Sequence, residues 1–193
     1  MFSFSVKSSS VLKATLFLFM VFFGGTNFCY GNDSIKELIH GRLSADKKTL
    51  DLSGGKIGPR GAKVLAGMSL LANVEMLLLQ GNKIKYAGIK NLAKSPHSTN
   101  IKHLDLWGNM IGDMGLKVLS ESNFIKGLEV LKLWKNEIGD DSLELMVKSS
   151  NFKHLKTLML NNNMVTPVGA GYLANPDVFP QLETLNLFRN SIG

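Results

Sequence analysis

Cysteine is almost absent from this sequence, because Cys29 is the single one among 193 residues. One thiol cannot form a disulfide within the chain, so the fold must be held together by packing alone. Short catalytic motifs are also missing: there is no glycine-rich phosphate loop, no nucleophile elbow and no HExxH. No metal-ligand spacing relates the histidines, which are His40, His97, His103 and His154. The sequence therefore predicts a protein that is not an enzyme and that needs no cofactor or metal ion.

Before the first repeat described below, one long apolar run stands near the N-terminus, from Ala14 to Gly25 (ATLFLFMVFFGG). It is uncharged, it follows Lys7 and Lys13, and its length of about a dozen residues is too short to span a bilayer comfortably. These features are typical of the apolar core of a secretory signal peptide. We therefore predict that the protein is secreted or exported, to the extracellular space or the periplasm.

The predicted signal peptide covers residues 1–31. Cys29 and Gly31 are small residues at the two positions that matter for a cut before Asn32. Cleavage there leaves a mature chain with no cysteine and no stable membrane span. Two alternatives stay open, an uncleaved membrane anchor and a lipoprotein acylated at Cys29. The second is disfavoured because the preceding Thr-Asn-Phe lacks the small and aliphatic residues that such a cleavage box needs.

Two leucines separated by one residue return six times at a constant spacing of 27 residues. The pairs are Leu50/Leu52, Leu77/Leu79, Leu104/Leu106, Leu131/Leu133, Leu158/Leu160 and Leu185/Leu187. Three residues after the second leucine the sequence has Gly55, Asn82, Asn109, Asn136, Asn163 and Asn190. Two residues further on it has Ile57, Ile84, Ile111, Ile138, Val165 and Ile192. Chance does not produce six copies in phase, so the pattern predicts a solenoid of stacked repeats.

The unit resembles the ribonuclease-inhibitor-like class of leucine-rich repeats, whose hallmark is LxxLxLxxNxIGxxGxxxL with an α-helix on the convex side. Residues 57–61 (IGPRG) and 111–115 (IGDMG) match this hallmark closely, whereas Ser142 replaces the second glycine. The resemblance covers about residues 47–193, with the last repeat incomplete. It implies an α/β fold, a right-handed horseshoe with a parallel concave β-sheet and convex helices. The class includes inhibitors, GTPase activators, innate sensors and bacterial effectors, so it indicates fold better than function.

Each unit divides into a strand half and a helix half. Both leucines of the strand half point inward, and the residues beside them point outward on the concave face. The helix half begins with proline, which suits the first helical position, or with aspartate, which suits the positive end of the helix dipole. These starts are Gly58-Pro59, Gly112-Asp113, Gly139-Asp140 and Thr166-Pro167.

Residues 32–46 precede the first repeat and are predicted to form a capping helix and a linker. Asp33 or Ser34 is the expected N-cap of a helix over residues 32–43, and Ile35, Leu38 and Ile39 lie on one face at helical spacing. A terminal repeat needs such a cover, because an open solenoid end exposes its core.

Charged residues alternate in sign two positions before the first leucine of each pair: Lys48, Glu75, Lys102, Glu129, Lys156 and Glu183. On adjacent parallel strands this predicts a ladder of opposite charges. The net charge of +7 falls to +5 without Lys7 and Lys13, and the ladder uses three of the remaining lysines for pairing. Nucleic-acid binding needs basic residues gathered on one face with stacking aromatics, so we predict no nucleic-acid partner.

The outward positions form three columns across neighbouring strands, and these columns are where function is expected. The column that follows the second leucine holds both tryptophans of the protein, Trp107 and Trp134, with Phe188 two repeats later. Exposed tryptophan is enriched at binding hot spots. The predicted protein-binding residues are Met76, Leu78, His103, Asp105, Trp107, Val130, Lys132, Trp134, Met159 and Phe188. The alternative is that the tryptophans stack on each other and on Lys132 or Lys135 as ordinary surface.

The asparagine column is predicted to be structural, because a stacked amide has both donors and acceptors for the loop backbone. His103 beside Asp105 is the one pair with conceivable acid–base geometry, and no other feature supports catalysis there.

The most direct functional hypothesis is an exported interaction module that binds another protein through its concave face. The alternative is the recognition region of a longer exported effector enzyme or GTPase regulator. Gly193 falls where the helix of the sixth unit is expected to begin. The sequence therefore predicts a longer natural chain, a truncated copy, or an end that is covered by a partner or by end-to-end self-association.

Overall fold

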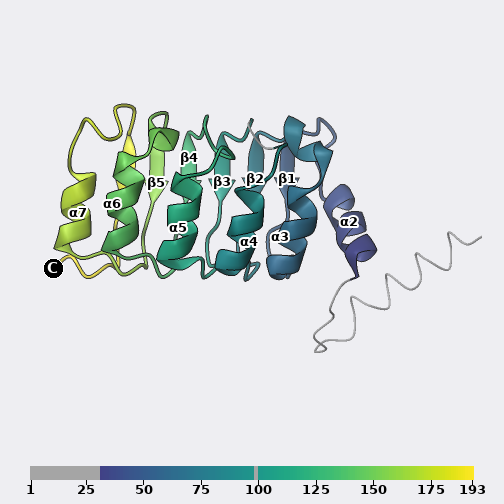
Figure 1. Ribbon diagram of the computed structural model, residues 1–193, viewed down its shortest axis with the longest axis horizontal. Helices are drawn as coiled ribbons and strands as arrows, with labels where there is room; N and C mark the ends of the chain where they lie inside the picture. The colour runs from purple at the N-terminus through teal and green to yellow at the C-terminus, as the bar shows by residue number, and fades with distance from the viewer. Residues whose placement is uncertain (1–30, 98–99) are drawn as a thin grey trace, which may run out of the picture.

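The computed structural model describes residues 31–97 and 100–193, so the predicted signal peptide lies outside the described residues except for Gly31. Six parallel strands form one sheet in sequence order (Figure 1). Every strand residue pairs with the residue 27 positions further on, as Leu50 does with Leu77 and Leu77 with Leu104. The strands are β1 (Thr49–Asp51), β2 (Met76–Leu78), β3 (His103–Asp105), β4 (Val130–Lys132), β5 (Thr157–Met159) and β6 (Thr184–Asn186). The predicted α/β solenoid is confirmed.

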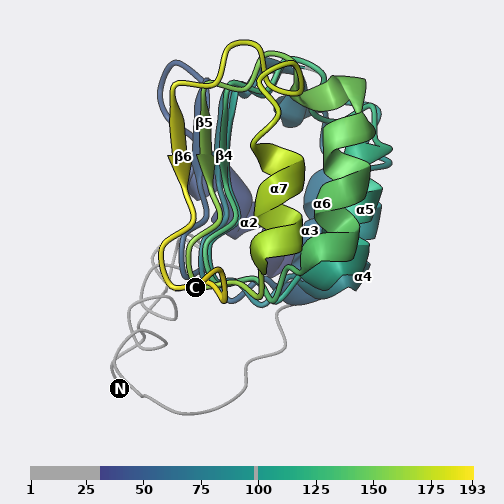
Figure 2. The same cartoon turned by 90° about the vertical axis from the view of Figure 1, so that its left-hand side faces the viewer.

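The helices of the repeats all lie on one face of this sheet, and the other face is left open (Figure 2). They are α3 (Gly58–Ala66), α4 (Lys85–Leu92), α5 (Gly112–Ser120), α6 (Asp140–Lys148) and α7 (Pro167–Leu173), with 3-10 helices η1 (Ser69–Asn73) and η2 (Ser150–Phe152) in the return loops. Packed helices need about 8–10 Å and paired strands about 4.8 Å, so the stack curves with the sheet on the inside. In residues 31–97 and 100–193, none of the helices is long and apolar enough to cross a membrane.

The core lies between the two layers and consists of the predicted repeat positions. The leucine pairs from Leu50 to Leu160 are fully buried, together with Val74, Ile101, Leu128 and Leu155 from the inward position before each pair. The last repeat differs, because Leu185 is 37% exposed and Leu187 is half-buried. β6 forms one edge of the sheet, so its inward side chains have packing partners on one side.

The other end of the solenoid is covered by α2 (Asn32–Gly41), which packs beside α3 (Figure 1). Ile35 and Ile39 are buried against the first repeat. The cover also protects the sheet, since Leu43 forms an antiparallel bridge with Leu50 and the Ser44 amide donates to the Thr49 carbonyl at 2.9 Å. The predicted linker thus satisfies part of the free edge of β1, which reduces the exposure of an unpaired edge strand.

The predicted N-cap of this capping helix, Asp33 or Ser34, is wrong, and the helix ends two residues before the predicted end at residue 43. The helix begins at Asn32, with Gly31 as its N-cap, and ends at Gly41. Ser34 does not cap the helix because its hydroxyl donates to the Gly31 carbonyl at 2.9 Å.

The asparagine ladder, which consists of Asn82, Asn109, Asn136, Asn163 and Asn190, fastens each loop to the next repeat. Asn109 represents the pattern: its Oδ1 accepts from the amides of Asn82 and Ile84, both at 3.2 Å. Its Nδ2 donates to the carbonyls of Leu79 and Leu106, both at 2.9 Å. Asn82, Asn109 and Asn136 are almost completely buried. The predicted structural role of these residues is confirmed.

Two aspartates at the helix starts form contacts that sequence reasoning missed. Asp113 of α5 accepts from the Gly139 amide at 2.7 Å and from the Ser142 hydroxyl at 2.6 Å. Asp140 of α6 accepts from the Thr166 amide at 2.9 Å and from the Thr166 hydroxyl. The predicted interaction with the dipole of their own helix is therefore joined by a bond to the next repeat. Ser142, which departs from the repeat hallmark, is explained by the hydroxyl that it donates to Asp113.

Candidate functional site on the concave face

The open face of the sheet carries the three predicted columns in a constant register. Thr49, Met76, His103, Val130, Thr157 and Thr184 are paired in one column, and Asp51, Leu78, Asp105, Lys132, Met159 and Asn186 in another. The third column, which follows each second leucine, is Ser53, Gln80, Trp107, Trp134, Asn161 and Phe188. No helix covers this face in Figure 2, so side chains of neighbouring repeats form a continuous surface.

Trp107 and Trp134 stack on each other at the centre of this surface. Their ring centroids are 5.2 Å apart and the rings are inclined by 25°. Despite this contact Trp107 stays 42% exposed and Trp134 38% exposed. The stacking expected from the alternative interpretation is therefore present, and it leaves a large apolar surface in solvent. We call the two tryptophans and the side chains next to them, Gln80, Asp105, Lys132 and Asn161, the aromatic patch.

Asp105 is a covered member of the aromatic patch that bonds to the backbone of Trp107. Asp105 lies in an outward column of the sheet, but it is only 7% exposed, so neighbouring side chains cover most of it. Its Oδ1 accepts from the Trp107 amide at 3.0 Å, and its Oδ2 lies 3.7 Å from Lys132 Nζ. Asn186 makes the equivalent bond to the Phe188 amide at 2.9 Å. A side-chain acceptor two residues before the aromatic fixes the direction in which the chain leaves the strand.

The other predicted site residues differ in how accessible they are. Met76, Trp107, Trp134 and Phe188 are exposed, and Leu78, His103, Val130, Lys132 and Met159 are half-buried. Phe188 is separated from the tryptophans by Asn161 and lies under Arg189, whose guanidinium is 5.4 Å from the ring centroid. The structure therefore brings together the tryptophans, Asp105 and Lys132, and leaves Phe188 as a second exposed aromatic on the same face.

Gln80 and Asn161 flank the tryptophan pair in the same column, and sequence reasoning did not select them. Gln80 Oε1, Asn161 Oδ1 and His103 Nε2 are buried atoms without a hydrogen-bond partner in the described part of the chain. Unpaired buried polar atoms are uncommon in folded proteins and each calls for an explanation. All three lie on the concave face around the tryptophans, which distinguishes this region from the fully bonded asparagine ladder.

His103 does not form an acid–base pair with Asp105. Its Nε2 has no partner, and the Asp105 carboxylate is used by Trp107 and Lys132. Burial lowers the pKa of His103, and the positive charge of Lys132 lowers it further, against the opposing effect of Asp105. A neutral imidazole is thus favoured near pH 7. Over residues 31–97 and 100–193, no group of three or more His, Cys, Asp or Glu side chains is arranged to hold a metal ion.

The predicted charge ladder borders the amino ends of the strands and is closed in part. Glu75 lies 2.8 Å from Lys48 and 3.3 Å from Lys102, and Glu129 lies 2.7 Å from Lys156. Within the described residues, the steps from Lys102 to Glu129 and from Lys156 to Glu183 form no ion pair within 4.0 Å. Hydrogen bonds from Lys48 and Lys102 lower the pKa of Glu75. Several lysines and glutamates of the ladder therefore pair with each other, and few of these charges are available to a ligand.

Comparison with known proteins agrees with this architecture. A family model described as Leucine Rich repeat matches residues 48–66 and 97–120. The two segments include β1 with α3 and β3 with α5, so each holds the strand and helix of one unit. No catalytic family is found, and no curated protein matches the chain significantly.

Proposed function

We propose that this leucine-rich-repeat domain is an exported module that binds a partner protein through its concave face, with Trp107 and Trp134 of the aromatic patch and the nearby Met159 and Phe188 as anchors. Leucine-rich-repeat domains generally bind proteins. The observation that carries the proposal is the stacked tryptophan pair, which stays about two-fifths exposed on a face that no helix covers. Export is supported by the apolar segment from Ala14 to Gly25.

The energetics of the patch favour a protein ligand. Tryptophan combines a large apolar area with few rotatable bonds, and a pair that is already stacked loses little further freedom when a partner covers it. Binding energy in such interfaces concentrates in a few central aromatic side chains. Asp105 fixes the backbone at Trp107, so one of the anchors is oriented before the partner arrives.

The test compares capture of partners by the full chain and by a variant with Trp107→Ala and Trp134→Ala. Tagged protein is expressed in its source cells, partners are cross-linked and recovered, and the affinity of the most strongly depleted partner is measured by calorimetry. We expect the double variant to fold and to lose about 2 kcal/mol or more of binding free energy. Leu145→Ala is the matched control, because Leu145 is 38% exposed like Trp134 but belongs to α6 on the opposite layer. If the double variant and the wild type bind every recovered partner equally well, the proposal is contradicted.

The edge formed by β6 favours a second contact. Leu185 is exposed there, and an edge strand presents amides and carbonyls that can pair with another chain. A second copy of this chain, bound end to end, is one partner that could cover the edge of β6. Light scattering of the full chain over a hundredfold range of concentration tests this, and a constant monomer mass rejects it. The alternative of a recognition region within a longer effector enzyme or GTPase regulator has no matched catalytic family in its favour.

A further inference from the structure

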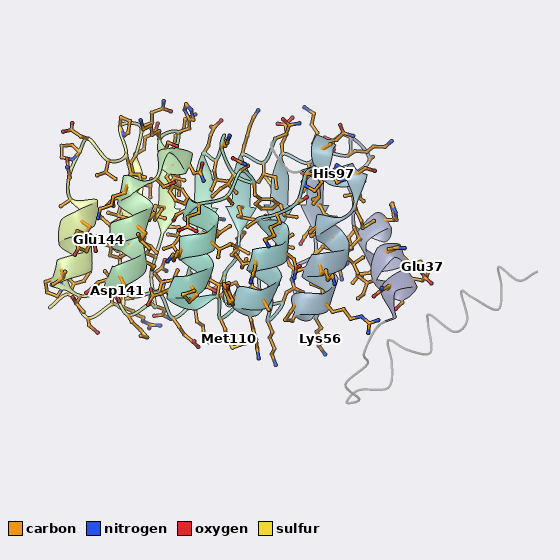
Figure 3. All side chains as sticks on the ribbon, viewed as in Figure 1. Glu37, Lys56, His97, Met110, Asp141 and Glu144 are labelled. Atoms are coloured by element: carbon orange, nitrogen blue, oxygen red, sulfur yellow. The ribbon has the colours of Figure 1, made fainter. Side chains whose placement is uncertain are left out.

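Exposed apolar side chains gather where the strands end and the helices begin. We call this edge the carboxyl-end rim; it consists of residues 53–60, 80–87, 107–114, 134–141, 161–168 and 188–193, and it is the lower edge in Figure 3, where Lys56 and Met110 are labelled. Ten large apolar side chains are exposed among the described residues, and seven of them belong to this rim. The seven are Trp107, Met110, Met114, Trp134, Met164, Val168 and Phe188. The aromatic patch is thus one part of a wider apolar band.

A groove of about 430 Å³ runs along the carboxyl-end rim across repeats two to five. Met110 and Met164 line it, together with the backbone of Gly81 and Gly108 and the charged residues Lys83, Lys135 and Glu137. Both glycines have positive φ angles, 69° and 65°, and the positions that a β-carbon would take are open, so no side chain fills the groove there. Trp107 precedes Gly108 and Trp134 precedes Lys135, another lining residue. The groove is therefore continuous with the aromatic patch.

Positive charge gathers on the carboxyl-end rim at the repeat-two end of the groove, which Lys83 lines, and beyond it in repeat one. The rim segments of repeats one and two, 53–60 and 80–87, contain Lys56, Arg60, Lys83 and Lys85 and no aspartate or glutamate. Arg60 donates to Asn32 at 3.0 Å, whereas none of the three lysines forms an ion pair in the described part of the chain. Lys56 and Lys83 are equivalent residues of adjacent repeats, so their like charges face each other across one repeat spacing, an arrangement that destabilises the stack slightly. Because repulsion between these lysines lowers the stability of the fold, an anionic ligand that binds here would offset it.

The shape of the site favours a protein chain as the occupant. Four neighbouring strands cover about 14 Å, which corresponds to about four residues of extended chain. A flat bilayer surface cannot enter a groove, whereas an extended segment can. The methionines on its walls are flexible and adapt to varied apolar side chains.

We propose that the groove of the carboxyl-end rim binds an extended segment of the partner protein, with acidic residues over Lys56, Lys83 and Lys85 and large apolar side chains over Met110, Met164 and the tryptophans. This inference rests on the proposed function and adds the chemical class and the orientation of the ligand. The acidic end of the segment lies over repeats one and two, and its apolar part lies over repeats three to five.

The first experiment selects ligands without assuming their sequence. A displayed library of random twelve-residue peptides is panned against the full chain, and the enriched peptides are synthesised. Binding is followed by the fluorescence of Trp107 and Trp134, which are the two tryptophans of the protein and lie beside the groove. We expect the enriched peptides to combine acidic residues with aromatic or long aliphatic ones, and their affinity to fall as salt rises.

Charge reversal then locates the site. Lys56→Glu with Lys83→Glu is expected to weaken the enriched peptides about tenfold or more. Glutamate fits these backbone positions, since Glu137 occupies the equivalent one in repeat four with φ 62°. Lys126→Glu with Lys153→Glu is the matched control, because both lysines are exposed in the loops at the opposite edge, and it is expected to leave the affinity within about twofold. Lys83→Glu alone provides a milder variant if the double one unfolds.

The outcomes separate this inference from the proposed function. Peptides that need the tryptophans but show no acidic bias and ignore Lys56 and Lys83 overturn the groove inference and leave the concave-face proposal standing. Peptides that ignore the tryptophans, or a selection that enriches nothing, overturn both. Lysine-dependent binding of vesicles with one-third phosphatidylserine, or of a single-stranded oligonucleotide, without any enriched peptide assigns the rim to a membrane or nucleic acid and also overturns the inference.

Discussion

The two edges of this solenoid are built from the same repeats but differ in the arrangement of their charged residues. At the amino ends of the strands, lysine and glutamate alternate, and Glu75 pairs with both Lys48 and Lys102. At the carboxyl ends, Lys56 and Lys83 have the same sign; among residues 31–97 and 100–193 they form no ion pair, and seven of the exposed large apolar side chains lie there. A hollow of about 560 Å³ also lies on the amino-end edge, but its lining includes the paired residues Lys48, Glu75 and Lys102.

This difference indicates which positions of a repeat protein are free to carry a specific function. The leucines recur in all six units because they form the shared core, and the asparagines recur from the second unit on because each one bonds to the unit before it. A position that faces solvent carries no such requirement, and a side chain that is unfavourable for folding persists there only when something outside the stack uses it. The carboxyl-end rim and the aromatic patch meet that description, whereas the charge ladder serves register and solubility.

The largest expected effect comes from the ladder beneath the carboxyl-end rim. Asn109→Ala leaves the buried amides of Asn82 and Ile84 without their acceptor and removes one of the two bonds to the Leu79 carbonyl, which keeps the bond from Asn82. It is expected to cost about 4 kcal/mol of unfolding free energy. Asn190→Ala, at the half-buried last step, is expected to cost about half of that. Urea denaturation of both variants checks the order. Equal losses would mean that burial does not govern the ladder.

A second prediction concerns the aspartates at the helix starts. Asp113→Ala removes two bonds to the next repeat and is expected to cost about 2 kcal/mol. Asp141→Ala is the matched control, because Asp141 is an exposed residue of the first turn of α6 and is expected to lose about 0.5 kcal/mol through the helix dipole. Thermal and urea unfolding distinguish the two. If both variants lose the same small amount, the cross-repeat bond contributes nothing.

The tryptophan pair is predicted to matter less for folding than for binding. A double-mutant cycle of Trp107→Ala and Trp134→Ala is expected to give a coupling free energy of about 1 kcal/mol, the value for a stacked aromatic pair. The cycle is measured by urea denaturation, with Leu145→Ala as the exposed control on α6. A double variant that fails to fold contradicts the assignment of the pair to the surface, and the patch is then structural.

The amino-end edge is predicted to respond to acid. Because the pKa of Glu75 is lowered below its ordinary value of 4.5, the stability that it contributes is present above about pH 4.5 and is lost as the pH falls through its lowered pKa. Glu75→Gln is expected to remove this dependence, with a smaller loss at pH 7 than in the variants above. Glu183→Gln serves as control because Glu183 forms no ion pair in the described residues. Urea midpoints between pH 3 and pH 7 give the comparison.

The smallest expected effect tests whether the like charges of the carboxyl-end rim lower the free energy of unfolding. Lys83→Glu places an opposite charge beside Lys56 and imitates the alternation of the other edge. It is expected to stabilise the fold by about 0.3 kcal/mol in low salt, and the gain is expected to disappear at about 1 M salt. A loss of stability in low salt would show that the like charges of this rim are not in conflict with folding.

Much of the molecule was predictable because its information is local and repeated. The 27-residue spacing gave the strand register, and the leucines from Leu50 to Leu160 are buried as expected. Less was predictable where two repeats meet through side chains. The bond from Asp113 to Ser142 joins two positions that the repeat pattern treats separately. The burial of Asp105 also escaped prediction, because alternation along a strand does not reveal what the side chain contacts after the strand ends.

By itself, the sequence determined the solenoid, its register, its buried leucines and the asparagines that fasten the loops, since a constant period forces equivalent residues into equivalent surroundings. The tertiary structure decided that the two tryptophans stack yet stay exposed, and that methionines and glycines of different repeats form one groove next to Lys83. The physical reason is that side-chain contacts across the stack depend on distances between repeats, and these are set by how strands of about 4.8 Å spacing and helices of about 8–10 Å spacing settle together.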